Sequence, residues 1–168
     1  GKRRLRWFAE TDISVADDPD LLDLMRESGC AQVLIGFESP IDEGLAGIEL
    51  KRDWKRHHLP KYKEAIRTIQ SHGITVNGCF IVGLDGQSSK IFDDIFDFVK
   101  EVELYEVQVT ILTPFPGTPL YARLLEEDRI LEPGNWKKCT LFDINYQQAT
   151  MTVEEMRRAF LGLVARLY

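Results

Sequence analysis

Glutamates stand at the ends of two apolar runs, and carboxylates at such positions can bind a ligand or carry out acid–base chemistry. Glu10 ends the run Leu5–Glu10, and Glu38 lies near the end of the run Val33–Ser39. If both runs are neighbouring parallel strands, about 5 Å apart at the backbone, the two carboxylates share one pocket. There they could accept hydrogen bonds from ligand hydroxyls, act as an acid–base pair or bind a metal. Alternatively, each caps the helix that follows it or pairs with a nearby lysine or arginine.

The run Thr75–Gly83 ends in the tight turn Gly83-Leu84-Asp85-Gly86, where glycine permits a ligand to approach the backbone closely. Along this run Asn77 and Cys79 share one face, because alternate residues of a strand point to the same side. Asn77 is therefore a hydrogen-bonding candidate if that face lines a pocket. Cys79 is expected to be a small buried filler, since free cysteine packs as a small hydrophobe more often than it reacts.

A fourth run, Val107–Thr113, enters the turn Thr113–Pro119, in which three prolines surround a glycine. Such a turn is rigid, and its first role is to fix where the chain leaves the strand. Thr113 stands at the end of this run, the position that Glu10, Glu38 and Gly83 hold in the other three.

A basic cluster follows the second run and could supply a cation to the same pocket. Most runs of this kind are solvated faces, and adjacent histidines on a helix cannot both face one metal. One arginine could nevertheless clamp a ligand carboxylate with two parallel hydrogen bonds, and spacing favours Arg56. The cluster consists of Lys51, Arg52, Lys55, Arg56, His57 and His58.

Each of the four runs is followed by a helical pattern, and this alternation predicts an α/β fold of about four β-α units. Right-handed crossovers make all four strands parallel, as in a parallel barrel or sheet. In such folds ligands bind at the carboxyl ends of the strands, which is where the candidate residues stand. The expected strands are Leu5–Glu10, Gln32–Phe37, Ile74–Val82 and Glu106–Leu112.

Capping residues set the expected helix boundaries. Asp17-Asp18-Pro19 begins a helix that Gly29 ends, and a helix over Leu59–His72 ends at Gly73. Shorter helices are expected over Asp42–Ile48 and Pro119–Glu127. Ser88 or Ser89 is expected to cap a further helix, whose buried stripe is Ile91, Phe92, Ile95, Phe96 and Val99.

The last part of the chain departs from this alternation. A strand is expected around Leu141–Ile144, and Thr152 with Glu155 forms a capping box that opens a final helix through Leu167. We therefore expect a C-terminal strand and helix after the β-α units.

Composition limits the class of protein. The 168 residues suffice for one domain with a real core, and the formal charge of −6 argues against non-specific nucleic-acid binding. No apolar run approaches the ~20 residues that a membrane-spanning helix needs. The three dispersed cysteines favour a reducing cytoplasm. The chain enters its first strand almost at once without a Met, and we expect it to be an excised piece of a longer chain.

Four motifs, in order, resemble the second half of the barrel of radical S-adenosylmethionine (SAM) enzymes, especially the group with an N-terminal cobalamin-binding domain. The resemblance covers roughly Leu5 to Glu127. It implies a partial parallel (βα) barrel, over residues 1–130, that lacks its first two β-α units, and an extension over residues 131–168 that packs on it. The motifs are Glu10-Thr11-Asp12, Ile35-Gly36-Phe37-Glu38-Ser39, Gly78 to Gly86 and Thr113 to Tyr121.

The resemblance also implies roles for individual residues. Glu10 and Glu38 would contact the SAM ribose or neighbouring groups, and the strand through Gly78–Gly83 would line the adenine. A basic residue near Arg56 would meet the methionyl carboxylate, while Cys79 stands where some relatives place an aspartate. The implied cofactor-binding set is Glu10, Glu38, Ser39, Arg56, Asn77, Cys79, Ile81, Gly83 and Thr113.

Two motifs of the family are absent from the sequence. There is no Cys-x3-Cys-x2-Cys loop for the [4Fe–4S] cluster, and the glycine-glycine-glutamate segment that holds the methionyl amine is missing. We therefore expect that the longer parent is the enzyme, that it holds the cluster and SAM, and that this chain alone is catalytically silent. Cobalamin is a further cofactor that the resemblance suggests for the parent. No catalytic and no metal-ligating residue is assigned within the chain.

Two other functions remain open. The chain could be a metal-independent barrel lyase or hydrolase with Glu10 and Glu38 as acid and base, or a module that binds a nucleoside-like ligand without turnover. In any of these cases the first strand, Leu5–Glu10, presents an exposed parallel edge. We expect that edge to pair in a homo-oligomer or to be covered by the strand around Leu141–Ile144.

Overall fold

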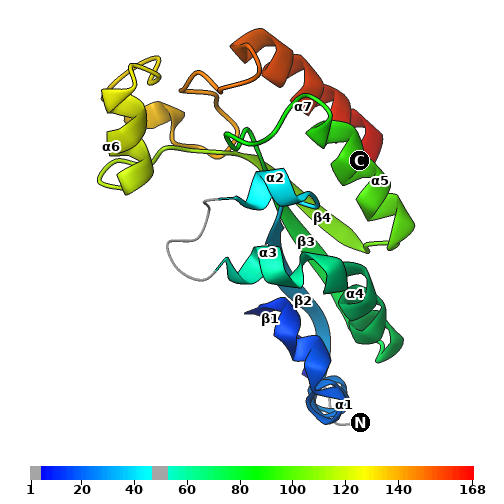
Figure 1. Ribbon diagram of the computed structural model, residues 1–168. Helices are drawn as coiled ribbons and strands as arrows, with labels where there is room; N and C mark the ends of the chain where they lie inside the picture. Colours follow the sequence, from blue (N-terminus) through cyan, green and yellow to red (C-terminus); the bar gives the residue numbers. More distant parts are fainter. Residues whose placement is uncertain (1–4, 47–52) are drawn as a thin grey trace.

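The computed structural model describes residues 5–46 and 53–168, and its strands form one parallel sheet (Figure 1). The strand order is β1-β2-β3-β4, so each strand neighbours the next one along the chain. All three pairings are parallel, which confirms the predicted α/β class with four parallel strands. The strands are β1 (Trp7–Thr11), β2 (Cys30–Glu38), β3 (Thr75–Val82) and β4 (Glu106–Ile111).

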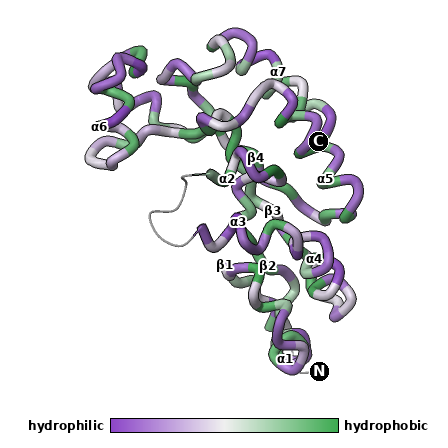
Figure 2. The backbone as a smooth tube through the Cα atoms, viewed as in Figure 1, coloured by the Kyte–Doolittle hydropathy of each residue, from purple (hydrophilic) through white to green (hydrophobic). Residues whose placement is uncertain are grey.

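The longer helices that follow the strands carry the apolar stripes expected of them. Helices α4 and α5 each bury one face against β3, and α7 lies along α5 (Figure 1). Figure 2 shows the result on the helices, along which apolar and hydrophilic residues alternate. These helices are α1 (Pro19–Ser28), α4 (Tyr62–Ser71), α5 (Ile91–Glu101), α6 (Pro119–Glu126) and α7 (Val153–Leu167).

Short helices occupy the connections. Two of them, α2 (Asp42–Leu45) and α3 (Trp54–His58), lie between β2 and α4. The expected helix over Asp42–Ile48 is thus present as far as Leu45, and Ile48 lies outside the described residues, as do Lys51 and Arg52 of the basic cluster. The described residues also include three short 3₁₀ helices: Ile13–Asp17, Leu59–Lys61 and Trp136–Lys138.

Capping explains where several helices begin and end. The Asp18 carboxylate accepts from the Leu21 N–H at the start of α1, and Gly29 ends that helix at φ 107°, a conformation glycine adopts without strain. Thr152 and Glu155 form the predicted capping box of α7, each satisfying a backbone N–H of the other's residue.

The core lies between the sheet and the covering helices. Its centre is an aromatic group in which Phe37 of β2 contacts Tyr62, Phe80 and Phe98, with ring centroids 4.9, 5.7 and 6.1 Å away. Gly78 leaves room for this group, because a Cβ there would stand 3.2 Å from the Phe37 ring.

Three expectations about the later elements are wrong. Neither Ser88 nor Ser89 caps α5, because Lys90 is its N-cap residue and the Ser88 hydroxyl accepts only from the Lys90 N–H, 3.4 Å away. Phe98, rather than Phe96, completes the buried stripe; Phe96 is half-buried under the Arg166 guanidinium, 3.9 Å from its ring centroid.

The expected strand over Leu141–Ile144 is a series of bends. Thr140 Oγ1 accepts hydrogen bonds from the Phe142 and Asp143 N–H groups, which turns the chain instead of extending it. The Leu141 carbonyl accepts from Ile111 N–H of β4, so this segment adjoins the edge opposite β1 and does not cover β1. None of the described helices is long and apolar enough to cross a membrane.

Candidate functional site

The sheet face opposite the packed helices carries polar side chains at alternate strand positions, and it is called the inner face below. Phe8 and Glu10 of β1 and Glu106 and Gln108 of β4 are exposed on this face. On β2, β3 and β4 the side chains that point to the opposite face, against the helices, are buried. The inner face comprises Phe8, Glu10, Gln32, Leu34, Gly36, Thr75, Asn77, Cys79, Ile81, Glu106, Gln108 and Thr110.

Strand register places two glutamates and an asparagine in one row across this face. Glu10 pairs with Leu34, Leu34 pairs with Asn77, and Asn77 pairs with Glu106. Since neighbouring strands are about 4.8 Å apart, Asn77 stands between the two carboxylates. Glu106 and Gln108 were missed by the sequence analysis, because alternating polar residues on a strand are equally typical of a solvated face.

Glu38 is not level with Glu10, contrary to the expectation that they hold equivalent positions. Glu10 pairs with Leu34, four residues before Glu38, because β1 and β2 are staggered as strands of a barrel are. A register shift between Gly36 and Glu38 ends the regular pairing with β3.

A turn at Glu38 returns its carboxylate to the inner face. Glu38 has φ 63°, and the Ser39 N–H donates to the Phe37 carbonyl at 2.8 Å, so the backbone closes a three-residue turn of the uncommon left-handed kind. The side chain folds back over Gly36, where a Cβ would stand only 2.6 Å from Glu38 Oε1. Such strain costs about 1–3 kcal/mol and is typically kept where function needs it.

Lys55 of α3 supplies the cation on this side of the sheet. Its Nζ donates to Glu38 Oε1 and to the Gly36 carbonyl, both at 2.6 Å, and the side chains of Lys55 and Glu38 are about four-fifths buried. The Tyr62 hydroxyl lies 3.3 Å from the Lys55 carbonyl and 3.4 Å from the Phe37 carbonyl, which ties α3 to the end of β2.

Arg56, the arginine that spacing favoured, makes a different contact. Its guanidinium donates two hydrogen bonds, each 2.5 Å long, to the Asp42 carboxylate on the exposed side of α2. Hydrogen bonding to Arg56 holds the pKa of Asp42 below its ordinary value. That Arg56 binds a ligand carboxylate stays a prediction; among the described cluster residues, Lys55 is the one that the structure places beside Glu38.

The pKa of the Cys79 thiol reflects the charges that surround the inner face. Burial, followed by the negative charges of Glu38 and Glu10, raises the pKa of the Cys79 thiol to about 11. Lys55 lowers that pKa and Glu106 raises it further, so all four charged groups act on one sulfur atom. The thiol lies 3.8 Å from Gln108 Oε1. The inner face is therefore acidic, with Lys55 as a counter-charge at one end.

Asn77 carries an unsatisfied polar atom in this setting. Its side chain is 4% exposed, and Oδ1 accepts no hydrogen bond from any residue that the structure describes. An acceptor left unpaired in a protein interior costs about 1–3 kcal/mol. A ligand with a hydroxyl or amino group would satisfy it.

Hydrogen bonds with the Gln87 and Tyr146 side chains fix the turn after β3. Gln87 Oε1 accepts from the N–H groups of Gly83 and Leu84, at 2.8 and 3.1 Å, and its Nε2 donates to the Ile81 carbonyl at 3.0 Å. The Tyr146 hydroxyl donates to the Gly83 carbonyl at 2.6 Å. Gly83 has φ 94°, and a Cβ there would stand 2.1 Å from the Tyr146 hydroxyl, so both conformation and space require glycine.

Two further candidates are buried at strand ends. Ser39 is fully buried beside Gly44 of α2, where a Cβ would come within 2.1 Å of the Ser39 hydroxyl oxygen. Thr113 is 8% exposed, and its hydroxyl donates to the Ile111 carbonyl at 3.0 Å. Glu10, Glu38, Asn77, Cys79 and Ile81 thus lie on or over the inner face, whereas Ser39, Gly83 and Thr113 support its rim.

The described residues offer no ligand set for an iron–sulfur cluster. They contain no group of three or more histidine, cysteine or acidic side chains that could hold a metal ion. The three cysteines are free, and Cys30 is buried in the core, where burial raises the pKa of its thiol.

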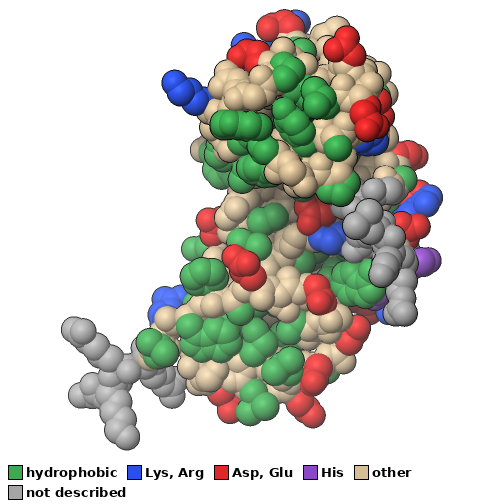
Figure 3. Space-filling view, turned by 90° about the vertical axis from the view of Figure 1, so that its left-hand side faces the viewer, with side chains coloured by type: hydrophobic (Ala, Val, Ile, Leu, Met, Phe, Trp, Pro, Cys, Tyr) green, Lys and Arg blue, Asp and Glu red, His purple; other side chains and the backbone are tan. Residues whose placement is uncertain are grey.

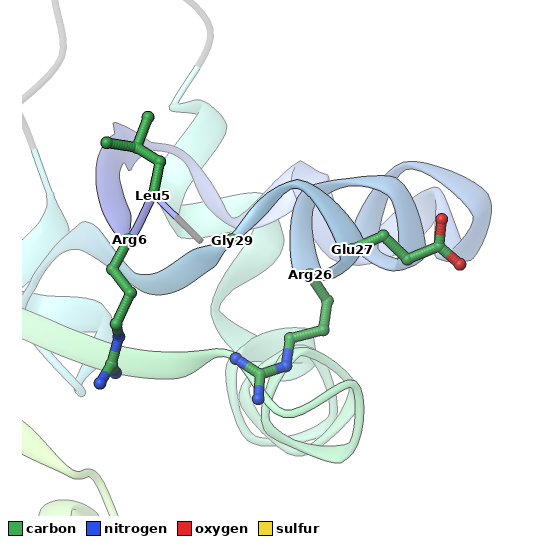
Figure 4. Close-up of a pocket in the computed structure, with 5 residues that line it drawn as sticks. All are labelled: Leu5, Arg6, Arg26, Glu27 and Gly29. Atoms are coloured by element: carbon green, nitrogen blue, oxygen red, sulfur yellow. The ribbon is translucent and has the colours of Figure 1, made fainter. Parts of the chain in front are cut away.

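A hollow of about 550 Å³ lies at the other end of the sheet, where β1 begins and α1 ends (Figure 4). Arg6 and Arg26 extend to the same side of it and Glu27 points away. None of the predicted site residues lines this hollow. Apart from Arg56, the predicted site residues therefore gather on the inner face and at the carboxyl ends of the strands.

The chain resembles a set of known proteins. The sequence model of the Radical SAM superfamily matches residues 3–99. A bacteriochlorophyllide d C-12(1)-methyltransferase of Chlorobaculum tepidum is 26% identical over 99% of this chain and 35% of its own length. A hopanoid C-2 methylase of Rhodopseudomonas palustris is 28% identical over 94% of this chain and 29% of its own length. The chain thus spans about a third of the length of these relatives.

A similar fold occurs in a solved structure. The methyltransferase TsrM from Kitasatospora setae, with cobalamin and a [4Fe–4S] cluster bound, superimposes with a TM-score of 0.59. The match covers 73% of this chain and 22% of TsrM, at 19% identity.

Proposed function

The chain belongs to the radical SAM superfamily, whose members use SAM and a [4Fe–4S] cluster, and from this we propose that its inner face binds SAM within a longer methyltransferase. Two relatives that match nearly the whole chain are a methyltransferase and a methylase. SAM supplies the methyl group or the adenosyl radical in this chemistry. The residues of this chain bind and orient it.

The observation that carries the proposal is the charge of the inner face around an unpaired buried acceptor. SAM is a cation overall, because its sulfonium and ammonium charges exceed its single carboxylate. Glu10, Glu38 and Glu106 against Lys55 give this region an excess of negative charge. Asn77 Oδ1 lies in the row between Glu10 and Glu106 and lacks a donor among the described residues.

We assign the contacts by chemistry and position. Glu10 and Glu38 accept hydrogen bonds from ribose hydroxyls, and Asn77 accepts one from an amino or hydroxyl group of the ligand. Cys79 and Ile81 line the adenine with apolar contacts. Lys55, rather than Arg56, meets the methionyl carboxylate, because Lys55 Nζ is already beside Glu38 while Arg56 is bound to Asp42.

Three of the sequence candidates act indirectly in this proposal. The groups of Ser39 and Thr113 that could bind a ligand are buried, and the Gly83 N–H and carbonyl are bonded to Gln87 and Tyr146. They hold the strand ends in the shape that SAM requires.

We place a division near residue 130, between the β-α units and the extension that carries Tyr146.

The [4Fe–4S] cluster does not fit the described residues, which lack a ligand set for it. Its cysteines, and cobalamin if the parent uses it as TsrM does, would be held elsewhere in the longer protein. That protein would also supply a partner for the free edge of β1, unless a second copy does. Free, dispersed thiols suit a reducing cytoplasm.

The test uses the full-length protein, reconstituted anaerobically with iron and sulfide. SAM binding is measured by equilibrium dialysis, and 5′-deoxyadenosine and S-adenosylhomocysteine are measured after adding a strong reductant. We expect SAM binding and the release of at least one of these products. Binding and cleavage that are both absent would refute the proposal.

Two matched substitutions localise the site. Lys55→Gln should weaken SAM binding about tenfold or more, because a hydrogen bond between charged groups is worth about 1.5–3 kcal/mol. Arg56→Gln is the control, one residue away in the same helix, and should leave SAM binding unchanged. Equal effects of the two substitutions would contradict the assignment of Lys55.

The alternative of an acid–base lyase finds less support in the geometry. Glu10 and Glu38 are staggered along the sheet, and Glu38 is already paired with Lys55. Turnover without iron or SAM, lost in Glu10→Gln, would favour that alternative.

A further inference from the structure

Four charged side chains join the turn after β3 to α6. Asp85, which lies in that turn, accepts from Arg123 of α6 at 2.7 Å and from Arg129 at 2.5 Å, through its two carboxylate oxygens. Glu127 accepts from the same two arginines, at 3.3 and 2.7 Å. The four side chains form a closed circle of alternating charge, called here the charge ring (Asp85, Arg123, Glu127 and Arg129).

Arg129 is the sheltered member of the charge ring. Its side chain is 18% exposed, against 47% for Arg123. Its Nε also donates to the Gln147 carbonyl at 2.8 Å, and its own carbonyl accepts from the Gln147 N–H at 2.7 Å. Burial raises the pKa of Asp85, but hydrogen bonds from Arg129 and Arg123 outweigh it and hold that pKa below its ordinary value. Asp85 is therefore ionised at neutral pH and bonded to two cations.

Apolar packing holds α6 less firmly than it holds the helices on the other side of the sheet. Leu124 is the one buried residue of α6, all of whose residues the structure describes. Helix α5 buries five residues and α4 buries four. Leu120 and Tyr121 of α6 reach the core only in part. The charge ring is therefore a large share of what keeps α6 in place, since local opening is easiest where few apolar groups are buried.

The charge ring lies at the rim of the inner face. In Figure 1, α6 stands across the sheet from α5 and α7, on the side of the inner face. Figure 3 looks at that side, and the upper part of the molecule, which contains α6, stands over a narrower middle. Asp85 directly follows Gly83 and Leu84, whose N–H groups donate to Gln87. The charge ring thus connects the end of β3 with a helix that stands beside the inner face.

We propose that Asp85 is a positioning residue that fixes α6 to the end of β3 through Arg123 and Arg129, so that a ligand bound at the end of β3 also steadies α6. This rests on the proposed function, because SAM is then the ligand that lies against β3. Helix α6 can open locally in two ways: the charge ring breaks, or the turn after β3 moves together with α6. SAM against Cys79 and Ile81 stops the second movement. It therefore acts on α6 through the charge ring without touching that helix.

The test uses the full-length protein, reconstituted anaerobically, with SAM as the probe. Hydrogen–deuterium exchange with mass spectrometry follows the backbone amides of α6. In the wild type, saturating SAM should slow their exchange about fivefold or more. Asp85→Asn should speed their exchange about tenfold without SAM, because hydrogen bonds between charged groups are lost. In this variant SAM should no longer slow the exchange.

The dissociation constant of SAM should change less than about twofold in Asp85→Asn. The N–H groups of Gly83 and Leu84 stay bonded to Gln87, so the strand end that SAM contacts is retained. Opening of α6 also remains a minor state, and a minor state scarcely alters an affinity. A loss of SAM affinity as large as the change in α6 exchange would mean that Asp85 acts on the SAM site itself, which would overturn the positioning role.

Asp93→Asn is the matched control. The Asp93 carboxylate accepts from Arg166 at 2.5 Å, so the same substitution breaks an ion pair between α5 and α7, away from α6. It should leave α6 exchange and its response to SAM unchanged, and equal effects of the two substitutions would overturn the proposal. Arg123→Gln is a second variant in case Asp85→Asn does not fold. It removes the link of α6 itself, leaves Asp85 with Arg129, and should speed α6 exchange by a smaller factor.

Salt distinguishes the charge ring from apolar packing. Raising NaCl from about 0.1 to about 1 M shortens the Debye length from about 10 to about 3 Å. This should speed α6 exchange in the wild type and have little effect in Asp85→Asn, where the charge ring is already broken. The same salt response in both proteins would overturn the proposal.

SAM binding, measured on the same samples, separates this inference from the proposed function. A wild type that binds SAM without slower exchange in α6 overturns the inference alone. A wild type that does not bind SAM overturns the proposed function, and with it the inference that SAM steadies α6.

Discussion

Cys79 makes the charge of the inner face measurable at a single residue. Burial and the carboxylates of Glu38 and Glu10 raise its pKa from 9.0 to about 11. Alkylation by iodoacetamide, followed by mass spectrometry, should therefore reach half its maximal rate near pH 11. Glu10→Gln should move that midpoint towards 9. A wild-type midpoint near 9 would mean that neither burial nor the two carboxylates act on the thiol.

The same shift affects stability. Below pH 9 the thiol is protonated in both the folded and the unfolded chain. Between pH 9 and about 11 the unfolded chain ionises first, so the folded state loses stability as the pH rises.

Asn77 is a residue at which ligand binding and stability oppose each other. Asn77→Leu removes a buried amide whose Oδ1 lacks a partner among the described residues. Without ligand we expect the free energy of unfolding to rise by about 1 kcal/mol, measured by urea denaturation. The increase in Tm that SAM gives the wild type should be lost. Gln108→Leu, at an exposed position of the same face, is the control. A destabilised ligand-free Asn77→Leu would show that its amide is already satisfied.

At the scale of elements, periodicity and caps predicted the four strands, α1, α4 and α7 because those signals are local. The segment over Leu141–Ile144 was wrongly predicted, since Thr140 competes for backbone N–H groups and its effect exceeds the strand preference of an apolar run. The strand ends were predicted as the site, but not the stagger of Glu10 against Glu38. Register depends on strand length and on the turn at Glu38, neither of which the sequence states.

The turn that ends β3 gives a prediction at this scale. Gly83→Ala should destabilise the protein by about 3 kcal/mol or more, from a left-handed backbone and overlap with Tyr146. Gly117→Ala, at φ 78° with nothing within 4 Å, should cost only about 1 kcal/mol. Each kcal/mol lowers Tm by about 2–4 °C in a protein of this size. Adding Tyr146→Phe should recover part of the Gly83→Ala loss; equal losses at both glycines would contradict the overlap.

For the whole molecule, the sheet has β1 at one edge, and the segment around Leu141 adjoins β4 at the other. A protein of these 168 residues should therefore self-associate at high concentration, because an uncovered strand edge pairs with another. Phe8→Lys places a charge on β1, where Phe8 is 66% exposed, and should give a monomer. Sedimentation velocity distinguishes the self-associated form from the monomer. A wild-type chain that stays monomeric at every concentration would show that the edge of β1 does not drive self-association.

The bonds that close the turn after β3 have a consequence for synthesis on the ribosome. The carbonyls of Gly83, Leu84 and Gln87 accept from Tyr146, Gln148 and Thr150, more than sixty residues further along the chain. A nascent chain can therefore pair its strands early, but it cannot complete this rim until those late residues have left the exit tunnel. A ribosome stalled before Tyr146 would hold a chain whose strands are paired but whose turn after β3 still lacks these hydrogen bonds.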